Sequence, residues 1–187
     1  MNRRNLLKGM GALALYGSFP GVLAEFASSC KSKAQIVRTG FFADDEFALL
    51  ENVVDIILPK TSTPGGLETR VPEFLDLVIK NCLAPEDQQS IKEGLQQLDK
   101  DAGGKFISLS KKEKVALVNK TDKAAYNNDP GKAWFAVMKK LALIGHFTSQ
   151  EGMEKALNYV KVPGTYEACI PYKQGEKAMA KTFLMYW

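Results

Sequence analysis

The sequence is poor in the residues that carry most cofactor and metal chemistry. Its 187 residues include one histidine, His146, and three cysteines, Cys30, Cys82 and Cys169. Three cysteines fall short of the four thiolates that usually hold an iron–sulfur cluster, and no Cys-x-x-Cys-His motif for haem attachment is present. A single histidine also lacks the partners that a catalytic triad or a transition-metal site needs. We therefore expect a chain that binds no cofactor and no metal and has no catalytic residues of its own.

Long hydrophobic runs and basic clusters are scarce as well. The apolar run 9–16 is followed by Gly17, Pro20 and Gly21, whereas a membrane-spanning helix needs about 20 apolar residues. The formal net charge is +4, but no basic run follows Lys33. A transmembrane helix and a nucleic-acid partner are therefore not expected.

The N-terminus reads as an export signal. A pair of arginines is followed by two leucines, a lysine and an apolar run, which is typical of a twin-arginine signal. The residues of this motif are Arg3, Arg4, Leu6, Leu7 and Lys8. We interpret residues 1–29 as the signal peptide and expect a periplasmic protein, with an ordinary secretory signal as the alternative.

The chain after this signal has two candidate processing sites. Residues 22–24 (VLA) fit the small-residue rule for cleavage, and residues 27–30 (ASSC) resemble a lipoprotein box ending at Cys30. Lipidation of Cys30 would anchor the protein to a membrane, and an unmodified Cys30 remains the alternative. We expect residues 30–43 to be a linker and residues 44–187 to form one domain.

The spacing of apolar residues predicts an all-α domain of about six helices with an irregular C-terminal arm. The expected helices begin at Asp44, Pro72, Pro85, Ser110, Asp129 and Thr148, and stop signals lie at Pro59, Gly103, Gly145 and Val162. Ser110 with Glu113 and Thr148 with Glu151 have the spacing of capping boxes. The fifth helix is the expected centre of the core, with an apolar stripe made of Trp134, Val137, Met138, Leu141 and Ile144.

The predicted arm beyond residue 162 is a candidate docking surface. It is too short for a core of its own and carries aromatic residues, which supply a large contact area. The candidate partner interface comprises His146, Phe147, Pro163, Tyr166, Cys169, Ile170, Pro171 and Tyr172. At the end of a helix, His146 suits capping or packing, and the alternative is a residue that faces a partner's substrate channel.

Cys169 has three possible states in an oxidising compartment. It could pair with Cys82, which the second helix places on or near its apolar face, or with a cysteine of a partner subunit, or it could stay free. Connectivity cannot be read from sequence alone, so Cys82 and Cys169 form a candidate disulfide with these alternatives open.

Several ordered blocks of this sequence resemble the gluconate 2-dehydrogenase subunit 3 family. They are residues 55–65 (DIILPKTSTPG), 71–76 (VPEFLD), 84–89 (APEDQQ), 145–152 (GHFTSQEG), 156–160 (ALNYV), 162–166 (VPGTY) and 169–173 (CIPYK). The resemblance extends over about residues 42–177, and His146 departs from it by replacing an expected aromatic residue.

The resemblance implies a non-catalytic small subunit of a periplasmic, FAD-dependent sugar or sugar-acid dehydrogenase complex. It implies that FAD is bound by a large subunit, a flavoprotein of the GMC type, and that a cytochrome c subunit is a further candidate partner. The small subunit would aid twin-arginine export and maturation of the flavoprotein, and the complex or a lipid anchor would hold it at the membrane. The alternative is a free-standing periplasmic scaffold or binding lipoprotein without a dehydrogenase partner.

Overall fold

The computed structural model of the chain describes residues 38–160, 162, 164–165, 169, 171 and 173–179. These residues all belong to the second of two compact units, Ile36–Trp187; the first unit is Met1–Gln35. The predicted export motif, Cys30, Pro163, Tyr166, Ile170 and Tyr172 therefore lie outside the described residues.

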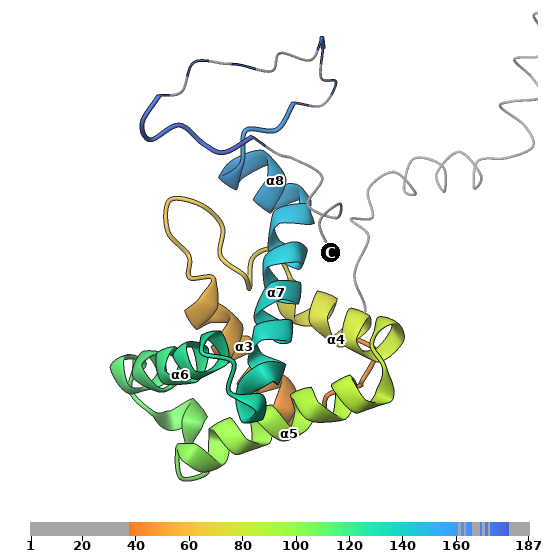
Figure 1. Ribbon diagram of the computed structural model, residues 1–187, viewed down its shortest axis with the longest axis vertical. Helices are drawn as coiled ribbons and strands as arrows, with labels where there is room; N and C mark the ends of the chain where they lie inside the picture. The colour runs from red at the N-terminus through yellow and green to blue at the C-terminus, as the bar shows by residue number, and fades with distance from the viewer. Residues whose placement is uncertain are drawn as a thin grey trace, which may run out of the picture. The chain divides into compact units, whose positions relative to one another are not determined.

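The described residues form an all-α domain, as predicted (Figure 1). Its α-helices are α3 (Asp44–Ile57), α4 (Val71–Cys82), α5 (Pro85–Asp101), α6 (Lys111–Tyr126), α7 (Ala133–Thr148) and α8 (Gln150–Ala156). Two short 3₁₀ turns, η1 (Phe106–Ser108) and η2 (Pro130–Lys132), precede α6 and α7. Within this part of the chain, the β-type pairing consists of an isolated bridge between Asn158 and Met179.

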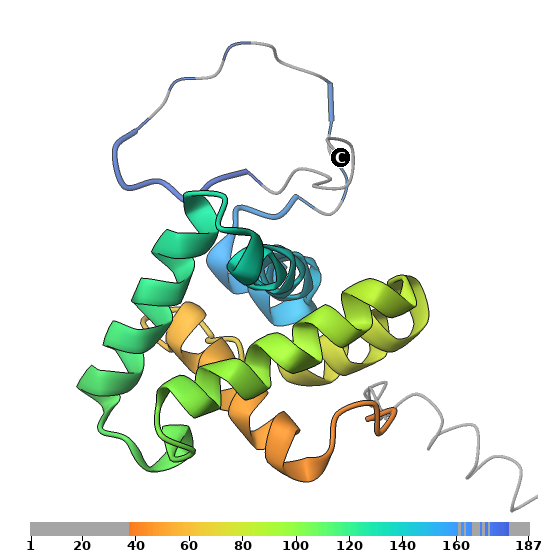
Figure 2. The same cartoon turned by 60° about the horizontal axis from the view of Figure 1, so that its bottom comes forward.

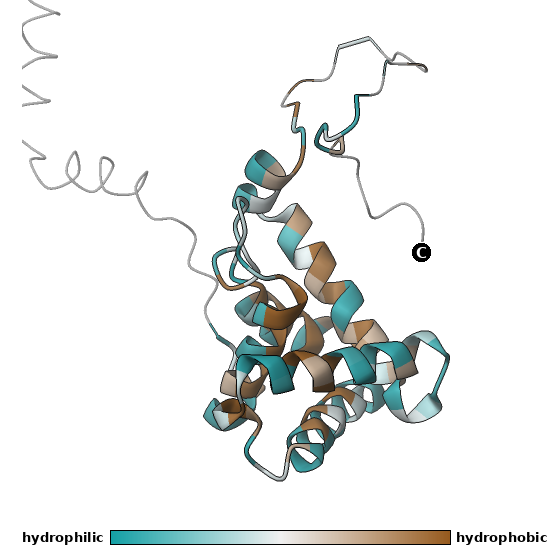
Figure 3. Ribbon diagram, turned by 90° about the vertical axis from the view of Figure 1, so that its left-hand side faces the viewer, coloured by the Kyte–Doolittle hydropathy of each residue, from teal (hydrophilic) through white to brown (hydrophobic). Residues whose placement is uncertain are grey.

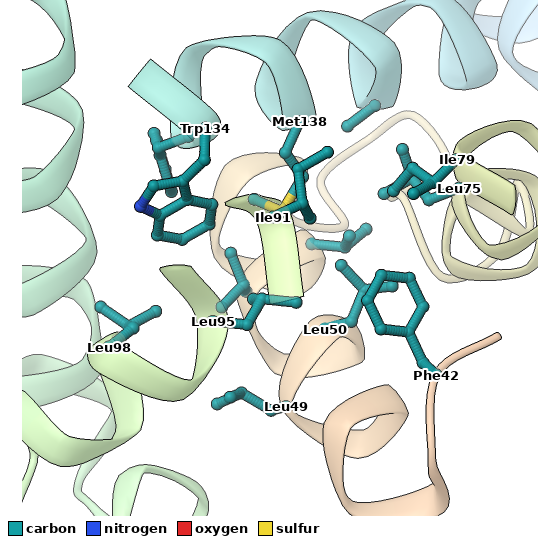
Figure 4. Packing of buried hydrophobic residues seen from close by; sticks show 14 of the residues in the cluster. Phe42, Leu49, Leu50, Leu75, Ile79, Ile91, Leu95, Leu98, Trp134 and Met138 are labelled. Atoms are coloured by element: carbon teal, nitrogen blue, oxygen red, sulfur yellow. The ribbon is translucent and has the colours of Figure 1, made fainter. Parts of the chain in front are cut away.

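Helix α7 is the centre of the domain, as predicted. Figure 2 looks nearly along its axis and shows α3, α5 and α6 around it. Trp134, Phe135, Met138 and Ala142 of α7 are buried, and their neighbours in the core come from α3, α4 and α5 (Figure 4). The approach to α5 is so close at Trp134 that a Cβ added to Gly94 would lie 2.2 Å from the indole ring.

The buried stripe of α7 differs from the predicted one. Val137 is 37% exposed, whereas Ala142 and Gly145 are buried. A Cβ at Gly145 would lie 2.4 Å from the ring of Phe74, so a small residue lets α4 approach the helix there. The prediction followed the large apolar residues and missed positions that are buried because they are small.

The helix boundaries were predicted well at α6 and less well around α8. Ser110 caps α6 and forms the predicted box with Glu113, but α3 is preceded by Ala43, and Asp44 is its first helical residue. Gly145 does not end α7, because Thr148 stays in the helix and donates its hydroxyl to the carbonyl of Ile144 at 2.7 Å. The cap of α8 is consequently Ser149 and not Thr148, and α8 ends at Ala156, earlier than predicted.

The described end of the predicted linker, residues 38–43, packs on the domain. Phe42 is 1% exposed, and the buried carboxylate of Asp76 on α4 accepts hydrogen bonds from the N–H of Phe42 at 3.1 Å and from the hydroxyl of Thr39 at 2.8 Å. Burial alone would raise the pKa of Asp76, but the hydrogen bonds from Phe42 and Thr39 outweigh it and lower this pKa. The N-terminal segment is therefore fastened to α4.

Candidate functional site

Three of the segments that carry the family resemblance meet at the C-terminal end of α7. The loop 58–70 lies beside this end, and α8 follows directly after it (Figure 1). We refer to the loop 58–70, the last turn of α7 and α8 together as the α7–α8 junction. No single stretch of sequence forms this junction, so its geometry is a product of the fold.

The loop 58–70 is folded tightly back on the end of α3. The N–H of Gly66 donates to the carbonyl of Leu58 at 2.8 Å, and a Cβ at Gly66 would lie 2.6 Å from Val54. Glu68 accepts a hydrogen bond from the N–H of Gly65 at 2.8 Å and forms an ion pair with Lys60. The contact with Lys60 and the bond from Gly65 lower the pKa of Glu68, so its carboxylate is held ionised.

His146 joins α7 to this loop through a buried polar contact. Its Nδ1 lies 2.9 Å from the hydroxyl oxygen of Thr69, and the side chains are 4% and 6% exposed. The Thr69 hydroxyl can donate its proton to the carbonyl of Gly65 at 3.0 Å. The hydroxyl oxygen then accepts from His146, which assigns the ring proton to Nδ1. Burial lowers the pKa of His146, so the neutral ring is favoured.

A second polar contact fixes the start of α8. Ser149 donates its hydroxyl proton to the carbonyl of His146 at 2.7 Å and accepts the N–H of Gly152 at 3.0 Å. A Cβ at Gly152 would lie 1.9 Å from the same carbonyl oxygen. Glycine is therefore required where α8 turns past the end of α7.

The segment that follows α8 returns to its own starting point, so that residues 177–178 contact residues 155–158. The N–H of Asn158 donates to the carbonyl of Ala178 at 2.8 Å, and Lys177 donates to the carbonyl of Lys155 at 2.6 Å. Apolar side chains of this segment are exposed: Tyr159 by 43%, Val160 by 46%, Val162 by 79% and Met179 by 44%. Exposed apolar residues gathered at one end of a domain are typical of a contact surface for another protein.

The predicted interface residues divide into three groups. His146 is buried and packs inside the domain, so the prediction that it contributes its side chain to a partner surface is corrected. Phe147 is half-buried, with its ring 4.8 Å from that of His146, while Cys169 and Pro171 are exposed. The remaining members, Pro163, Tyr166, Ile170 and Tyr172, lie outside the described residues.

Cys82 and Cys169 are both free and both exposed in the structure. Cys82 has the helical spacing of the buried Leu75 and Ile79, as predicted, but it is the last residue of α4 and lies exposed beyond the buried part of that face. The predicted pair between Cys82 and Cys169 is not formed in the structure.

Sequence reasoning missed two buried polar residues, Thr69 and Asp76. Asp76 lies between Pro72 and Ile79 at helical spacing on a buried face, and a carboxylate at such a position signals a buried acceptor. Thr69 carries no comparable pattern, because the loop around it follows no period.

A hollow of about 390 Å³ lies between α3, α5 and η1. Two carboxylates that line this hollow, those of Asp99 and Glu46, already accept hydrogen bonds from backbone N–H groups. Asp99 accepts the N–H of Phe106 at 3.0 Å, and Glu46 accepts the N–H of Ala43 at 3.1 Å. These contacts give both carboxylates a role in positioning neighbouring segments.

Two further findings apply to the part of the chain that the structure describes. It contains no group of three or more histidine, cysteine, aspartate or glutamate residues placed to hold a metal ion. None of its helices is both long enough and apolar enough to cross a membrane.

The helical domain with its α7–α8 junction has the features of a subunit that works through contacts with another protein. A family model described as gluconate 2-dehydrogenase subunit 3 matches residues 44–164, from the start of α3 to beyond α8. The chain therefore belongs to this family, and the resemblance seen in the sequence is confirmed. The family description identifies the chain as a subunit of a dehydrogenase complex. Comparisons with curated proteins and with solved structures gave no match.

Proposed function

We propose that the chain is the non-catalytic small subunit of a periplasmic, FAD-dependent dehydrogenase complex that oxidises a sugar or a sugar acid. One observation carries this proposal: the match to subunit 3 covers the whole body from α3 to α8, including the α7–α8 junction. FAD is then bound by the large subunit, a flavoprotein of the GMC type, and a cytochrome c subunit is a candidate third member.

The exposed apolar residues beyond α8 support a docking role for this end of the domain. Tyr159, Val160 and Val162 are placed where they can enter an interface and lose contact with water on binding. Cys169 is free and exposed in the same segment, so it is available for a disulfide to the large subunit. Non-reducing electrophoresis of the complex tests this bond, because a band at the summed mass requires it and separate bands exclude it.

We further propose that the small subunit provides the export signal for the complex. The motif at Arg3 and Arg4 is followed by a domain whose first described segment is fastened to α4 by Asp76. The twin-arginine route carries folded proteins, so a flavoprotein that has bound FAD and docked on this domain can cross the membrane with it. The complex, or a lipid on Cys30, then holds the subunit at the membrane surface.

Substitution of Arg3→Lys together with Arg4→Lys tests the export proposal. The change keeps the positive charge and the apolar run but removes the paired arginines, which a receptor reads. We expect the small subunit and its flavoprotein to remain together in the cytoplasm. Normal periplasmic amounts of the variant would contradict twin-arginine export, and export of the flavoprotein without the small subunit would contradict the shared route.

A further inference from the structure

The charges of the helical domain are segregated along the chain. Between residues 38 and 98, eleven carboxylates accompany five basic side chains, and between residues 99 and 140, ten lysines accompany five carboxylates. The first range contains α3, α4 and most of α5, and the second contains α6 and the first half of α7. The domain therefore combines an acidic part and a basic part in one nearly neutral body.

The basic part presents an exposed face on α6. Lys112, Lys120 and Lys123 are exposed, and their spacing places them along one side of the helix. Figure 3 views the domain from the side where α6 lies, with hydrophilic turns along the helix. Among the described residues, these three lysines form no ion pair within 4.0 Å, whereas Lys139 pairs with Asp122 at 2.7 Å.

The stability of α6 explains only part of this arrangement. Lys111 and Lys112 occupy the first turn, where the positive end of the helix dipole disfavours cations, and Glu113 is the acidic residue there. Lys120 and Lys123 are three residues apart, so like charges repel each other on the helix surface. Lys123 is in the last turn, where the helix dipole favours a cation, so the dipole accounts for Lys123 but not for Lys112. The unfavourable position of Lys112 and the close spacing of Lys120 and Lys123 are consistent with a partner that uses these charges.

An aromatic residue lies at the end of the same helix. Tyr126, the last residue of α6, is 87% exposed. Lys112 and Tyr126 are separated by 14 residues of helix, or about 21 Å at 1.5 Å per residue, which matches the dimensions of a protein interface and exceeds those of a small anion. Tyrosine is enriched at interfaces between proteins, and charged side chains around it steer the approach of a partner of opposite charge.

We propose that the exposed face of α6, defined by Lys112, Lys120, Lys123 and Tyr126, docks on an acidic surface of the dehydrogenase large subunit. The acidic part of the same body favours a protein over an extended anionic membrane, because α3 to α5 would be repelled by the membrane surface. The opposite charges also orient the domain as it approaches, and this orientation raises the rate of productive encounters. This inference rests on the proposed function and adds a second contact region to the α7–α8 junction.

The test compares two variants with the same loss of charge. The α6 variant is Lys112→Gln with Lys123→Gln. The matched control is Lys80→Gln with Lys100→Gln, which changes one exposed lysine from the acidic part and one from the basic part, on α4 and α5 and not on the exposed face of α6. The association rate of each purified protein with the purified large subunit is measured at low and at high ionic strength. At low ionic strength, we expect the α6 variant to associate about three- to tenfold more slowly than the wild-type protein. At high ionic strength, its association rate should approach that of the wild type, because salt screens the lysine charges. The control variant should associate at the wild-type rate under both conditions.

Other outcomes would overturn the proposal in distinguishable ways. Equal rates for the α6 variant and the wild type would refute the role of α6 and leave the proposed function intact. Failure of the wild-type protein to associate with any flavoprotein would remove the proposed function as well. Loss of binding to phosphatidylglycerol vesicles in the α6 variant, with unchanged association with the large subunit, would assign this face to the membrane.

Discussion

The two ends of α7 are built in different ways. At its first turns, Trp134 and Phe135 are enclosed by apolar side chains of α3, α5 and α6, with 5% and 0% exposure. At its last turn, His146 is held by polar contacts with a loop and with α8, and the chain beyond carries exposed apolar residues. The first end stabilises the fold by apolar burial, and the second positions a surface. Changes at the two ends should therefore separate stability from assembly.

The largest effect is expected from Phe135→Ala at the enclosed end. Phe135 is fully buried, so its removal leaves a cavity and lowers the free energy of unfolding by about 3–5 kcal/mol. Tyr126→Ala is the control, because its ring is 87% exposed and its loss should change stability by less than about 0.5 kcal/mol. Urea unfolding measures both, and equal small effects would contradict the assignment of the core.

Glycine substitutions compare the close contacts at the two ends. Gly94→Ala would place a Cβ 2.2 Å from the ring of Trp134 and should cost about 1–3 kcal/mol of unfolding free energy. Trp134→Phe in the same chain should recover part of this loss, because the smaller ring leaves room and the buried indole N–H has no partner among the described residues. A double variant no more stable than Gly94→Ala alone would contradict the steric explanation.

Gly152→Ala is the corresponding change at the other end. Its Cβ would lie 1.9 Å from the carbonyl oxygen of His146, and this backbone atom has little freedom to move. We expect faster hydrogen exchange in α8, with the amides around Trp134 still protected. Equal loss of protection at both ends would show that the two regions unfold as one unit.

The pH dependence of stability should also differ between two buried groups. The folded-state pKa of His146 is lowered, so its contribution is complete above its unfolded value of 6.5 and is lost as the pH falls from there toward the folded value. The pKa of Asp76 is lowered too, so its contribution is complete above the unfolded value of 3.8 and is lost at lower pH. Acid should therefore weaken the α7–α8 junction before it releases residues 38–43.

Thr69→Val tests whether His146 causes the first loss of stability as the pH falls. It removes the hydroxyl that accepts from Nδ1 and leaves a buried N–H unpaired, which should cost about 1–3 kcal/mol. Thr69→Ser keeps the hydroxyl and serves as the control. Unfolding followed by denaturant at several pH values measures the effect, and equal stability of the two variants would contradict the contact.

The smallest effect on stability is expected from Val162→Ser in the segment beyond α8. Val162 is 79% exposed, so the unfolding free energy should change by less than about 0.5 kcal/mol. The affinity of the variant protein for the large subunit should nevertheless fall, because serine offers less apolar area than valine at the proposed interface. Unchanged affinity would remove Val162 from the docking surface.

The same comparison separates what the sequence could predict from what it could not. The helices α3 to α7 were predicted because their apolar residues follow a helical period and because Pro85 and Ser110 mark helix starts. The burial of Ala142 and Gly145 could not be predicted, because it depends on how closely α4 approaches α7. The contact between Thr69 and His146 joins residues 77 positions apart, and no local pattern specifies it.

Isolation of the full-length protein from its native cells tests the central claim most directly. We predict that it is recovered with a flavoprotein in a constant ratio, and that the isolated complex reduces an electron-accepting dye with a sugar or sugar acid as donor. The small subunit separated from this complex should be colourless and inactive. Recovery of the protein alone, or flavin bound to this chain itself, would contradict its role as the non-catalytic subunit of a dehydrogenase complex.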